Sequence, residues 1–227
     1  MALYAISDLH LDLNGEKPMD IFGEQWMEHD GRLKDNWLSL ISEEDTVLVA
    51  GDISWSMTME EAGKELDWIH DLPGNKIFVK GNHDYWWGSI NKLNNLYDDM
   101  KFIQNNFFSY EEYAICGTRG WVSPGGDSFT QKDQKIYERE LIRLRLSVDS
   151  AIKAGFKKFI FMLHYPPFNE KLESGFIEII NEIKPKAVVY GHLHGPSAET
   201  AFCGVRDEVQ YIITSSDYLK FNPVRIL

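Results

Sequence analysis

The feature that most constrains this chain is a set of five short apolar segments, each ending at a cluster of polar residues. Each segment is rich in Val, Ile, Phe or Tyr without strict alternation, as is typical of strands buried on both faces. They lie at 3–6, 46–50, 76–79, 159–163 and 187–190. Stretches with helical spacing separate them, at 31–42, 58–71, 88–97, 131–154 and 172–183. Alternating strands and helices predict an α/β fold.

Two regions depart from this alternation. Short apolar pieces follow one another closely at 102–104, 107–110 and 113–116, which predicts antiparallel pairing, and the segment 200–227 has a similar character. We interpret the segments 14–30 and 122–131, rich in glycine, proline and charge, as loops that could rim a pocket. No repeat, low-complexity tract or linker divides the 227 residues, so we predict a single domain over 1–227.

Polar residues of a restricted kind follow the five predicted strands. In chain order they are Asp8 and His10, Asp52, Asn82 and His83, His164, and His192 and His194. Each motif alone is weak evidence, because Gly-Asp is usually a turn and a single histidine after a strand is usually a core residue. Five of the seven histidines, however, directly follow apolar strands. Ligands bind outside the carboxyl ends of the strands in open α/β sheets, so we expect these residues at one edge of the sheet.

These residue types indicate a metal site. Imidazole nitrogens and carboxylate oxygens suit borderline divalent metals such as Zn, Fe, Mn or Co. Seven or eight ligands exceed what one ion needs alongside water, whereas two ions that share a bridging carboxylate use all of them. Glycine precedes three of the five groups, which allows close approach of the backbone to a small ligand. The sequence therefore predicts a two-metal hydrolytic centre.

In this order the residues resemble the calcineurin-like metallophosphoesterase superfamily. Its pattern of Asp-x-His, Gly-Asp, Gly-Asn-His-Asp/Glu, His and Gly-His-x-His is complete over residues 8–194. The sequence as a whole is most similar to small bacterial predicted phosphohydrolases of that superfamily. The resemblance implies a four-layer α/β/β/α sandwich with two facing mixed β-sheets. In that fold, the strand-rich segments 101–122 and 200–227 would supply the second sheet.

The resemblance also implies roles for the polar residues. One ion would be held by Asp8, His10, Asp52 and His194, and the other by Asp52, Asn82, His164 and His192, with Asp52 bridging. The cofactors would be two divalent metal ions, of Mn, Fe, Zn or Co. The implied reaction is hydrolysis of a phosphomonoester or phosphodiester by a metal-bridging hydroxide. His83 would act beside the scissile bond, stabilising charge or protonating the leaving alkoxide.

Some positions depart from the protein phosphatase branch of the superfamily. Trp55 replaces the acidic residue expected three positions after Asp52, and the Asp-Arg-Gly motif is absent, which disfavours a protein phosphatase. Arg119, between two glycines, is a candidate substrate-binding residue that could fork two phosphate oxygens, and the alternative is a surface salt bridge. Tyr85, Trp86 and Trp87 could stack on a base or sugar, but aromatic residues that open a helix fit a core position better.

The composition of the chain limits which substrates and binding partners we expect. A net charge of −12 disfavours nonspecific nucleic-acid binding, and with it a nuclease, so we expect a small phosphorylated substrate. A cyclic-nucleotide or other small phosphodiesterase is the main alternative, and a non-catalytic scaffold of the same fold is less favoured because no ligand is lost. No apolar run could cross a bilayer, and no signal peptide is recognisable. Two cysteines without CxxC spacing predict buried thiols and a cytoplasmic location. The sequence carries no signal of oligomeric state.

Overall fold

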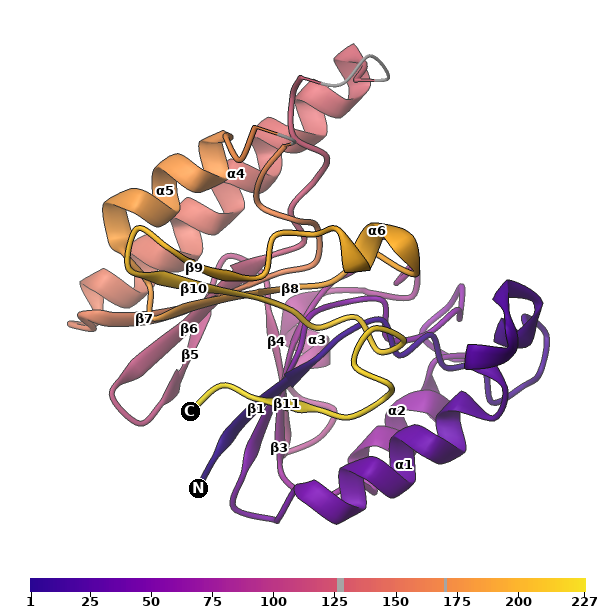
Figure 1. Ribbon diagram of the computed structural model, residues 1–227. Coiled ribbons are helices and arrows are strands. Elements are labelled where there is room, and N and C mark those ends of the chain that lie inside the picture. Colours follow the sequence, from indigo (N-terminus) through magenta and orange to yellow (C-terminus); the bar gives the residue numbers. More distant parts are fainter. Residues whose placement is uncertain (126–128, 170) are drawn as a thin grey trace.

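Two facing β-sheets form the centre of the molecule, with helices on their outer faces (Figure 1). The computed structural model describes residues 1–125, 129–169 and 171–227. The layers run α/β/β/α, which confirms the predicted four-layer sandwich. Within the described residues, no helix has the length and apolarity needed to span a membrane.

The first sheet has five strands in the order β11-β1-β2-β3-β4. Its strands are β1 (Leu3–Ile6), β2 (Thr46–Val49), β3 (Asn75–Val79), β4 (Met100–Ile103) and β11 (Val224–Arg225). All pairs are parallel except β1 with β11. The helical segments of this half are η1 (Met19–Phe22), η2 (Glu24–Trp26), α1 (His29–Leu40), α2 (Gly63–His70) and α3 (Ile90–Leu93).

The second sheet has six strands in the order β5-β6-β7-β8-β10-β9. They are β5 (Phe107–Tyr110), β6 (Tyr113–Thr118), β7 (Lys158–Leu163), β8 (Ala187–Tyr190), β9 (Gly204–Arg206) and β10 (Val209–Ile213). The four inner strands are parallel, and the edge strands β5 and β9 are antiparallel to their neighbours. The helices are α4 (Gln131–Lys153), α5 (Gly175–Ile183) and α6 (Pro196–Glu199). A capping box between Thr130 and Asp133 starts α4 at its predicted residue.

Three apolar cores explain why the strands lack alternation. In β1, Leu3 and Ala5 pack between the sheets, whereas Ile6 packs toward α1 and α2. In β7, Ile160 belongs to the same inter-sheet core, whereas Phe161 packs toward α4 and α5. Successive side chains of a strand point to opposite faces, so burial of both faces requires a continuous apolar run.

The structure corrects three strand placements. The predicted antiparallel pairing is confirmed for β5 with β6, but β4 pairs parallel with β3 in the first sheet. The residues between β3 and β4 supply the long crossover that a parallel pair requires. The segment 200–227 contributes β9 and β10 to the second sheet but β11 to the first. Because β7 and β8 belong to the second sheet, the polar clusters come from two facing sheets and not from one sheet edge.

Candidate metal centre

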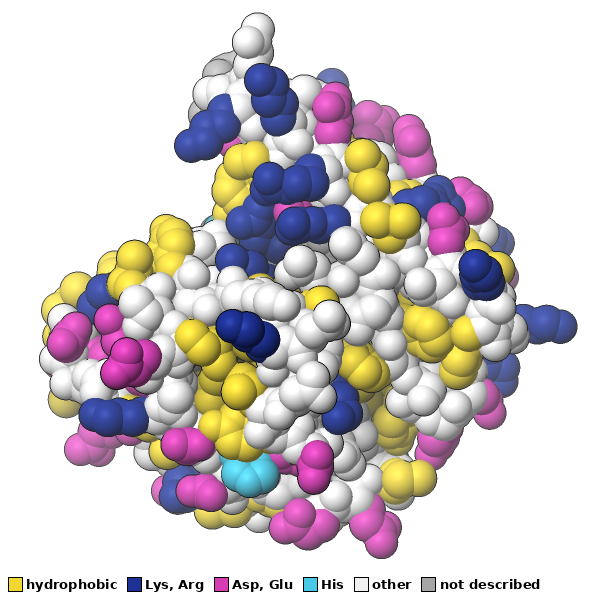
Figure 2. All heavy atoms as spheres, turned by 180° about the vertical axis from the view of Figure 1, so that it is seen from behind, with side chains coloured by type: hydrophobic (Ala, Val, Ile, Leu, Met, Phe, Trp, Pro, Cys, Tyr) yellow, Lys and Arg dark blue, Asp and Glu magenta, His cyan; other side chains and the backbone are white. Residues whose placement is uncertain are grey.

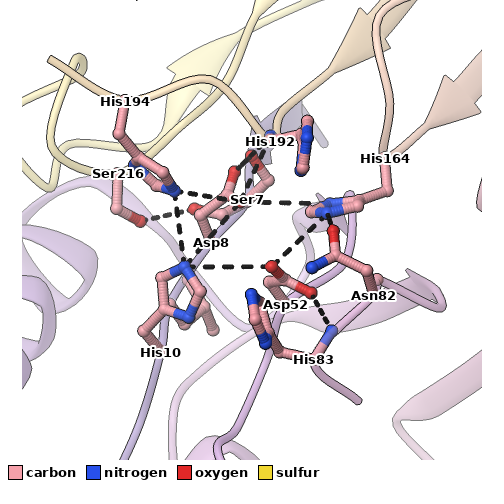
Figure 3. Close-up of polar contacts among 12 residues, drawn as sticks. Ser7, Asp8, His10, Asp52, Asn82, His83, His164, His192, His194 and Ser216 are labelled. Carbon is pink, nitrogen blue, oxygen red and sulfur yellow. Dashed lines mark hydrogen bonds and ion pairs between the residues drawn. The ribbon is translucent and has the colours of Figure 1, made fainter. Parts of the chain in front are cut away.

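The predicted ligands converge at one end of the sandwich, where both sheets deliver residues to the same place (Figure 3). The first sheet supplies residues after β1, β2 and β3, and the second supplies residues after β7 and β8. The set is Asp8, His10, Asp52, Asn82, His83, His164, His192 and His194. Asp8, His10, Asp52 and His164 are buried, so the centre lies within the sandwich and not on an exposed loop.

An unusual backbone conformation brings several of these side chains together. The φ angles are +56° at Asp8, +46° at His10, +51° at Asp52 and +72° at His192. Asp and His are among the residues that enter this left-handed region more readily than most. Residues in sparsely populated backbone regions cluster at functional sites, where the surrounding structure holds them. The conformation therefore supports a functional role for these four residues.

Glycines permit the close approach that the sequence suggested. A Cβ atom at Gly81 would lie 2.1 Å from both the backbone nitrogen and Oδ1 of Asp52. A Cβ atom at Gly191 would lie 2.3 Å from Oδ2 of Asp8. Real Cβ contacts are never this short, so any larger residue would displace these carboxylates.

One group of ligand atoms surrounds His10 and His194. Their Nε2 atoms lie 3.4 Å apart, and Oδ1 of Asp8 is 3.6 Å from Nε2 of His194 and 4.0 Å from that of His10. Oδ2 of Asp52 lies 3.9 Å from Nε2 of His10. Burial lowers the pKa of His10 to about 4, which leaves the imidazole neutral near pH 7. Two imidazole nitrogens facing carboxylate oxygens form a donor set suited to a divalent cation.

A second group surrounds His164. Its Nε2 lies 2.8 Å from Oδ1 of Asn82 and 3.4 Å from Oδ2 of Asp52, and its Nδ1 lies 3.0 Å from the carbonyl oxygen of Ala50. A neutral imidazole has one N–H, whereas both nitrogens here face oxygen acceptors. Burial alone would lower the pKa of His164, but the neighbouring carboxylates raise it to about 9. The oxygen atoms around His164 therefore favour a positive charge on or beside its ring, which a proton or a metal ion at Nε2 would supply.

Asp52 lies between the two groups. The same oxygen, Oδ2, faces Nε2 of His10 and Nε2 of His164. Oδ1 accepts a hydrogen bond from the backbone nitrogen of His83 at 2.8 Å. The ring of His192 lies beside the second group, with its centre 5.2 Å from that of His164. Asp8 and Asp52 both have carboxylate oxygens that face the two groups, and each set of Asp8, His10, His194 and of Asp8, Asp52, His164 is close enough to hold an ion.

An aromatic side chain positions His83. The Trp55 ring centre lies 4.3 Å from the ring of His83, and Trp55 also stacks on His10 at 4.9 Å with an interplanar angle of 21°. Trp55 thus fills the position where the protein phosphatase branch has an acid. Burial lowers the pKa of His83, whose side chain is half-buried beside the two groups of ligands.

One of the two predicted rim loops contacts the centre. From the loop 14–30, Trp26 contacts His10 and His194 edge-on. Residues 126–128 of the other predicted rim loop lie outside the described residues.

The structure places Arg119 beside the centre, with its guanidinium turned toward α4. Its carbonyl oxygen accepts hydrogen bonds from the backbone nitrogens of His164 and Tyr165, at 3.0 and 2.9 Å. Nη2 lies 3.3 Å from Oε1 of Glu140, and the guanidinium lies over the Trp121 ring. The salt bridge that the sequence left as an alternative is present, but Glu140 is fully buried and not a surface residue.

One carboxylate of the centre, Asp217, was missed by the sequence argument. Asp217 lies 2.8 Å from Nδ1 of His194 and accepts from the backbone nitrogen of Gly195. It follows β10 just as the predicted ligands follow their strands, a signal that could have identified it. Asp84, which the sequence offered as a neighbour that could orient His83, is instead fully buried where it accepts four backbone hydrogen bonds.

Other predicted residues divide into confirmed and corrected cases. Trp86 and Trp87 are buried in the core, as expected, but Tyr85 is 58% exposed, so the core position was wrong for that residue. Cys116 is buried, but Cys203 is exposed, so the prediction of two buried thiols was wrong for the second. Cys203 follows a short helix and precedes the edge strand β9, where one face is open to solvent.

Comparisons with known proteins agree with this architecture. A family model described as calcineurin-like phosphoesterase matches residues 1–196. The Gene 66 protein of Mycobacterium phage L5 is 37% identical over 78 residues, or 34% of this chain and 37% of that protein. The Gene 66 protein of Mycobacterium phage D29 is 27% identical over 103 residues, or 45% of this chain and 48% of that protein. The matches thus span less than half the length of these curated relatives.

Solved structures show the same fold. A phosphopantetheinyl hydrolase from Mycobacterium tuberculosis has a TM-score of 0.63 at 16% identity, covering 100% of this chain and 95% of that one. A protein of unknown function from Aquifex aeolicus has a TM-score of 0.51 at 17% identity, covering 99% and 95% of the two chains. At such low identities the likeness concerns the arrangement of strands and helices and carries no substrate with it.

Proposed function

Because the chain belongs to the calcineurin-like phosphoesterase family, we propose that it is a metal-dependent phosphoric ester hydrolase with a two-metal centre. The proposed ligands are Asp8, His10, Asp52, Asn82, His164, His192 and His194. The observation that supports this most strongly is the position of Asp52, whose Oδ2 faces a ligating nitrogen from each of two groups. We assign it the bridging role.

The metal ions would supply Lewis acidity, activating water and neutralising charge on the phosphoryl oxygens. The residue types fit Mn, Fe, Zn or Co in the divalent state. The chain itself holds the ligands in position through buried hydrogen bonds, such as that from the His192 backbone nitrogen to Oδ2 of Asp8, at 3.0 Å. Ligands fixed in advance need little reorganisation during the reaction.

His83 is the proposed catalytic residue outside the ligand set. Its backbone nitrogen is bonded to Asp52, and its ring is held against Trp55. This arrangement places a half-buried imidazole beside the bridging carboxylate. We assign it to stabilising charge on the phosphoryl group or to protonating the leaving alkoxide. Arg119 stays a candidate for substrate binding through a guanidinium that already pairs with Glu140.

The substrate class is a small phosphomonoester or phosphodiester. A net charge of −12 opposes contact with a long phosphate backbone, which disfavours a nuclease. A small phosphodiesterase, such as one acting on cyclic nucleotides, is the second candidate within the same chemistry. The complete ligand set argues against a non-catalytic scaffold. We place the protein in the cytoplasm on its low cysteine content.

The test is to remove bound metal, add back Mn²⁺, Fe²⁺, Zn²⁺ or Co²⁺, and measure hydrolysis of p-nitrophenyl phosphate and its bis-ester. Asp52→Asn should abolish turnover and reduce the metal content below two ions per chain. Asp207→Asn, the same change at an exposed carboxylate, is the matched control. Absence of hydrolysis with every metal would contradict the proposal. Full activity of Asp52→Asn with two ions bound would remove Asp52 from the bridging role.

A further inference from the structure

A basic cluster lies beside the proposed metal centre, and of its members only Arg119 has been given a part in the proposed function. Figure 2 shows Lys and Arg side chains gathered in and beside a hollow of the surface, on a chain whose net charge is −12. We define the basic cluster as Arg119, Arg139 and Arg143, which approach Glu140, together with Lys80, which follows the end of β3. Such a concentration of positive charge on an acidic protein needs a physical reason.

The cluster carries more positive charge than its buried partner can balance. Arg119, Arg139 and Arg143 all approach Oε1 of Glu140, at 3.3, 3.6 and 2.9 Å. The other oxygen, Oε2, accepts from Thr118 at 2.6 Å. Three guanidinium groups therefore share one oxygen of a single carboxylate. A structural role in neutralising Glu140 would need only one of them.

Lys80 adds to this excess. It lies between β3 and Gly81, on the segment that leads to the proposed ligand Asn82. A Cβ atom at Gly117 would lie 2.8 Å from the Val79 side chain, so the end of β3 lies next to β6, the strand that Arg119 follows.

The nearby acids are already engaged. Asp84 is turned toward backbone N–H groups, and Asp133 accepts from Trp121 and from Thr130. In the part of the chain that the structure describes, the buried Nε of Arg119 has no hydrogen-bond partner. The basic cluster thus places three guanidinium groups on one oxygen of Glu140 and keeps a buried N–H donor of Arg119 without a partner among the described residues.

A continuous wall connects the basic cluster to the metal centre. The guanidinium of Arg119 lies 4.5 Å from the Trp121 ring centre, and Trp121 lies 5.0 Å from Tyr165. Tyr165 packs on His192 with ring centres 3.9 Å apart. The backbone of Arg119 also bonds His164 directly, as described above. A ligand at the metal centre that extends along this wall reaches the cluster.

We propose that the basic cluster binds a second phosphate group of the substrate, carried on the part of the molecule away from the scissile ester. This inference rests on the proposed function and narrows its substrate class to small phosphoesters with a further phosphate. Guanidinium groups match phosphate oxygens in paired hydrogen bonds, and an ammonium contributes a compact charge. The second phosphate would supply the negative charge that Glu140 alone does not.

The test compares ligands that differ by one phosphate. Calorimetry on the metal-loaded protein gives the Kd of adenosine 3′,5′-bisphosphate against adenosine 5′-monophosphate, and of fructose 1,6-bisphosphate against fructose 6-phosphate. We expect the bisphosphate of at least one pair to bind roughly tenfold more tightly. Arg139→Ala and Lys80→Ala should each reduce that ratio about threefold or more. The Arg139 side chain is 53% exposed, so its loss should leave the fold intact.

Lys153→Ala is the matched control, because it removes one exposed positive charge from the last turn of the same helix. It should leave the ratio unchanged. Equal affinities within both pairs, or ratios that neither cluster variant alters, would overturn the inference. Turnover of p-nitrophenyl phosphate is measured in parallel. Turnover without bisphosphate preference rejects only the second-phosphate site, whereas bisphosphate preference without turnover rejects only the hydrolase.

Discussion

Replacing Asp84 by asparagine tests whether one buried carboxylate holds the loops of the metal centre together. Oδ2 accepts from the backbone nitrogens of Asp52 and Gly81 at 3.0 and 2.7 Å. Oδ1 accepts from those of Ile53 and Ser54 at 2.8 and 3.3 Å. The carboxylate thus joins the loop after β2 to the loop after β3.

The cost of the change follows from these four hydrogen bonds. Asparagine keeps one oxygen but presents an NH₂ group where the other oxygen was, so two backbone N–H groups lose their acceptor. Each unsatisfied buried donor costs about 1–3 kcal/mol, which gives a loss of about 2–6 kcal/mol. That is a large part of the roughly 5–15 kcal/mol by which a domain is stable.

Urea unfolding of the metal-free protein, followed by tryptophan fluorescence, measures this loss apart from metal binding. Burial raises the pKa of Asp84 to about 6, so the experiment is best run at pH 8, where the carboxylate is ionised. Asp207→Asn at an exposed site provides the control. If the free energy of unfolding of the two variants agrees within about 0.5 kcal/mol, the clamp assigned to Asp84 is refuted.

Three further predictions concern residues outside the proposed ligand set. Asp217→Ala should weaken metal binding by about 10–100-fold, because His194 loses the carboxylate that orients it, and the affinity of Asp217→Asn should lie between those of the parent and Asp217→Ala. Chelator competition measures the affinities, and equal values for the parent and both variants would contradict this prediction. Lys76→Met should destabilise the fold by about 1–2 kcal/mol in urea, because it removes a buried ammonium 2.6 Å from Asp99; unchanged stability would show that the pair contributes nothing. Burial tends to raise the pKa of Asp99, but hydrogen bonds from Lys76 and His70 lower it below 3.8. The stabilisation that Asp99 contributes should therefore be complete above its ordinary pKa and fade as the pH falls through its lowered pKa. When the free energy of unfolding is measured against pH, the Lys76→Met variant should lose less stability in acid than the parent.

The strand ends could be predicted because their physical signal is local. A strand such as β8, buried on both faces, must be apolar throughout, and a change to Gly-His at its end is visible in a few residues. The same reasoning located β1 and the start of α4 at their observed residues. The residues that converge at the end of the sandwich could be named before their geometry was known, because few residue types ligate metals and these types recur after each strand.

The sheet to which each strand belongs was harder to predict from the sequence, because it depends on pairing with strands that are distant in sequence. The residues of β4 do not themselves indicate whether the strand pairs antiparallel with β5, as expected, or parallel with β3, as observed. Asp217 illustrates the same limit for the site. Its position depends on the hydrogen bonds of Ser216 to the backbone oxygen of Ser7, 209 residues away in sequence. The partner of Arg119, Glu140, lies on a helix whose face toward the sheet became known only from the packing.

The division of the centre between two sheets has a consequence for protein synthesis. A growing chain that has emerged from the ribosome only as far as β4 carries Asp8, His10, Asp52 and Asn82. The remaining ligands and Asp217 emerge much later, and β1 gains its second neighbour, β11, later still. Four of the seven proposed ligands are therefore present before the other three exist. On the proposed ligand assignment, metal loading would belong to the final stage of folding, when the two sheets close on each other.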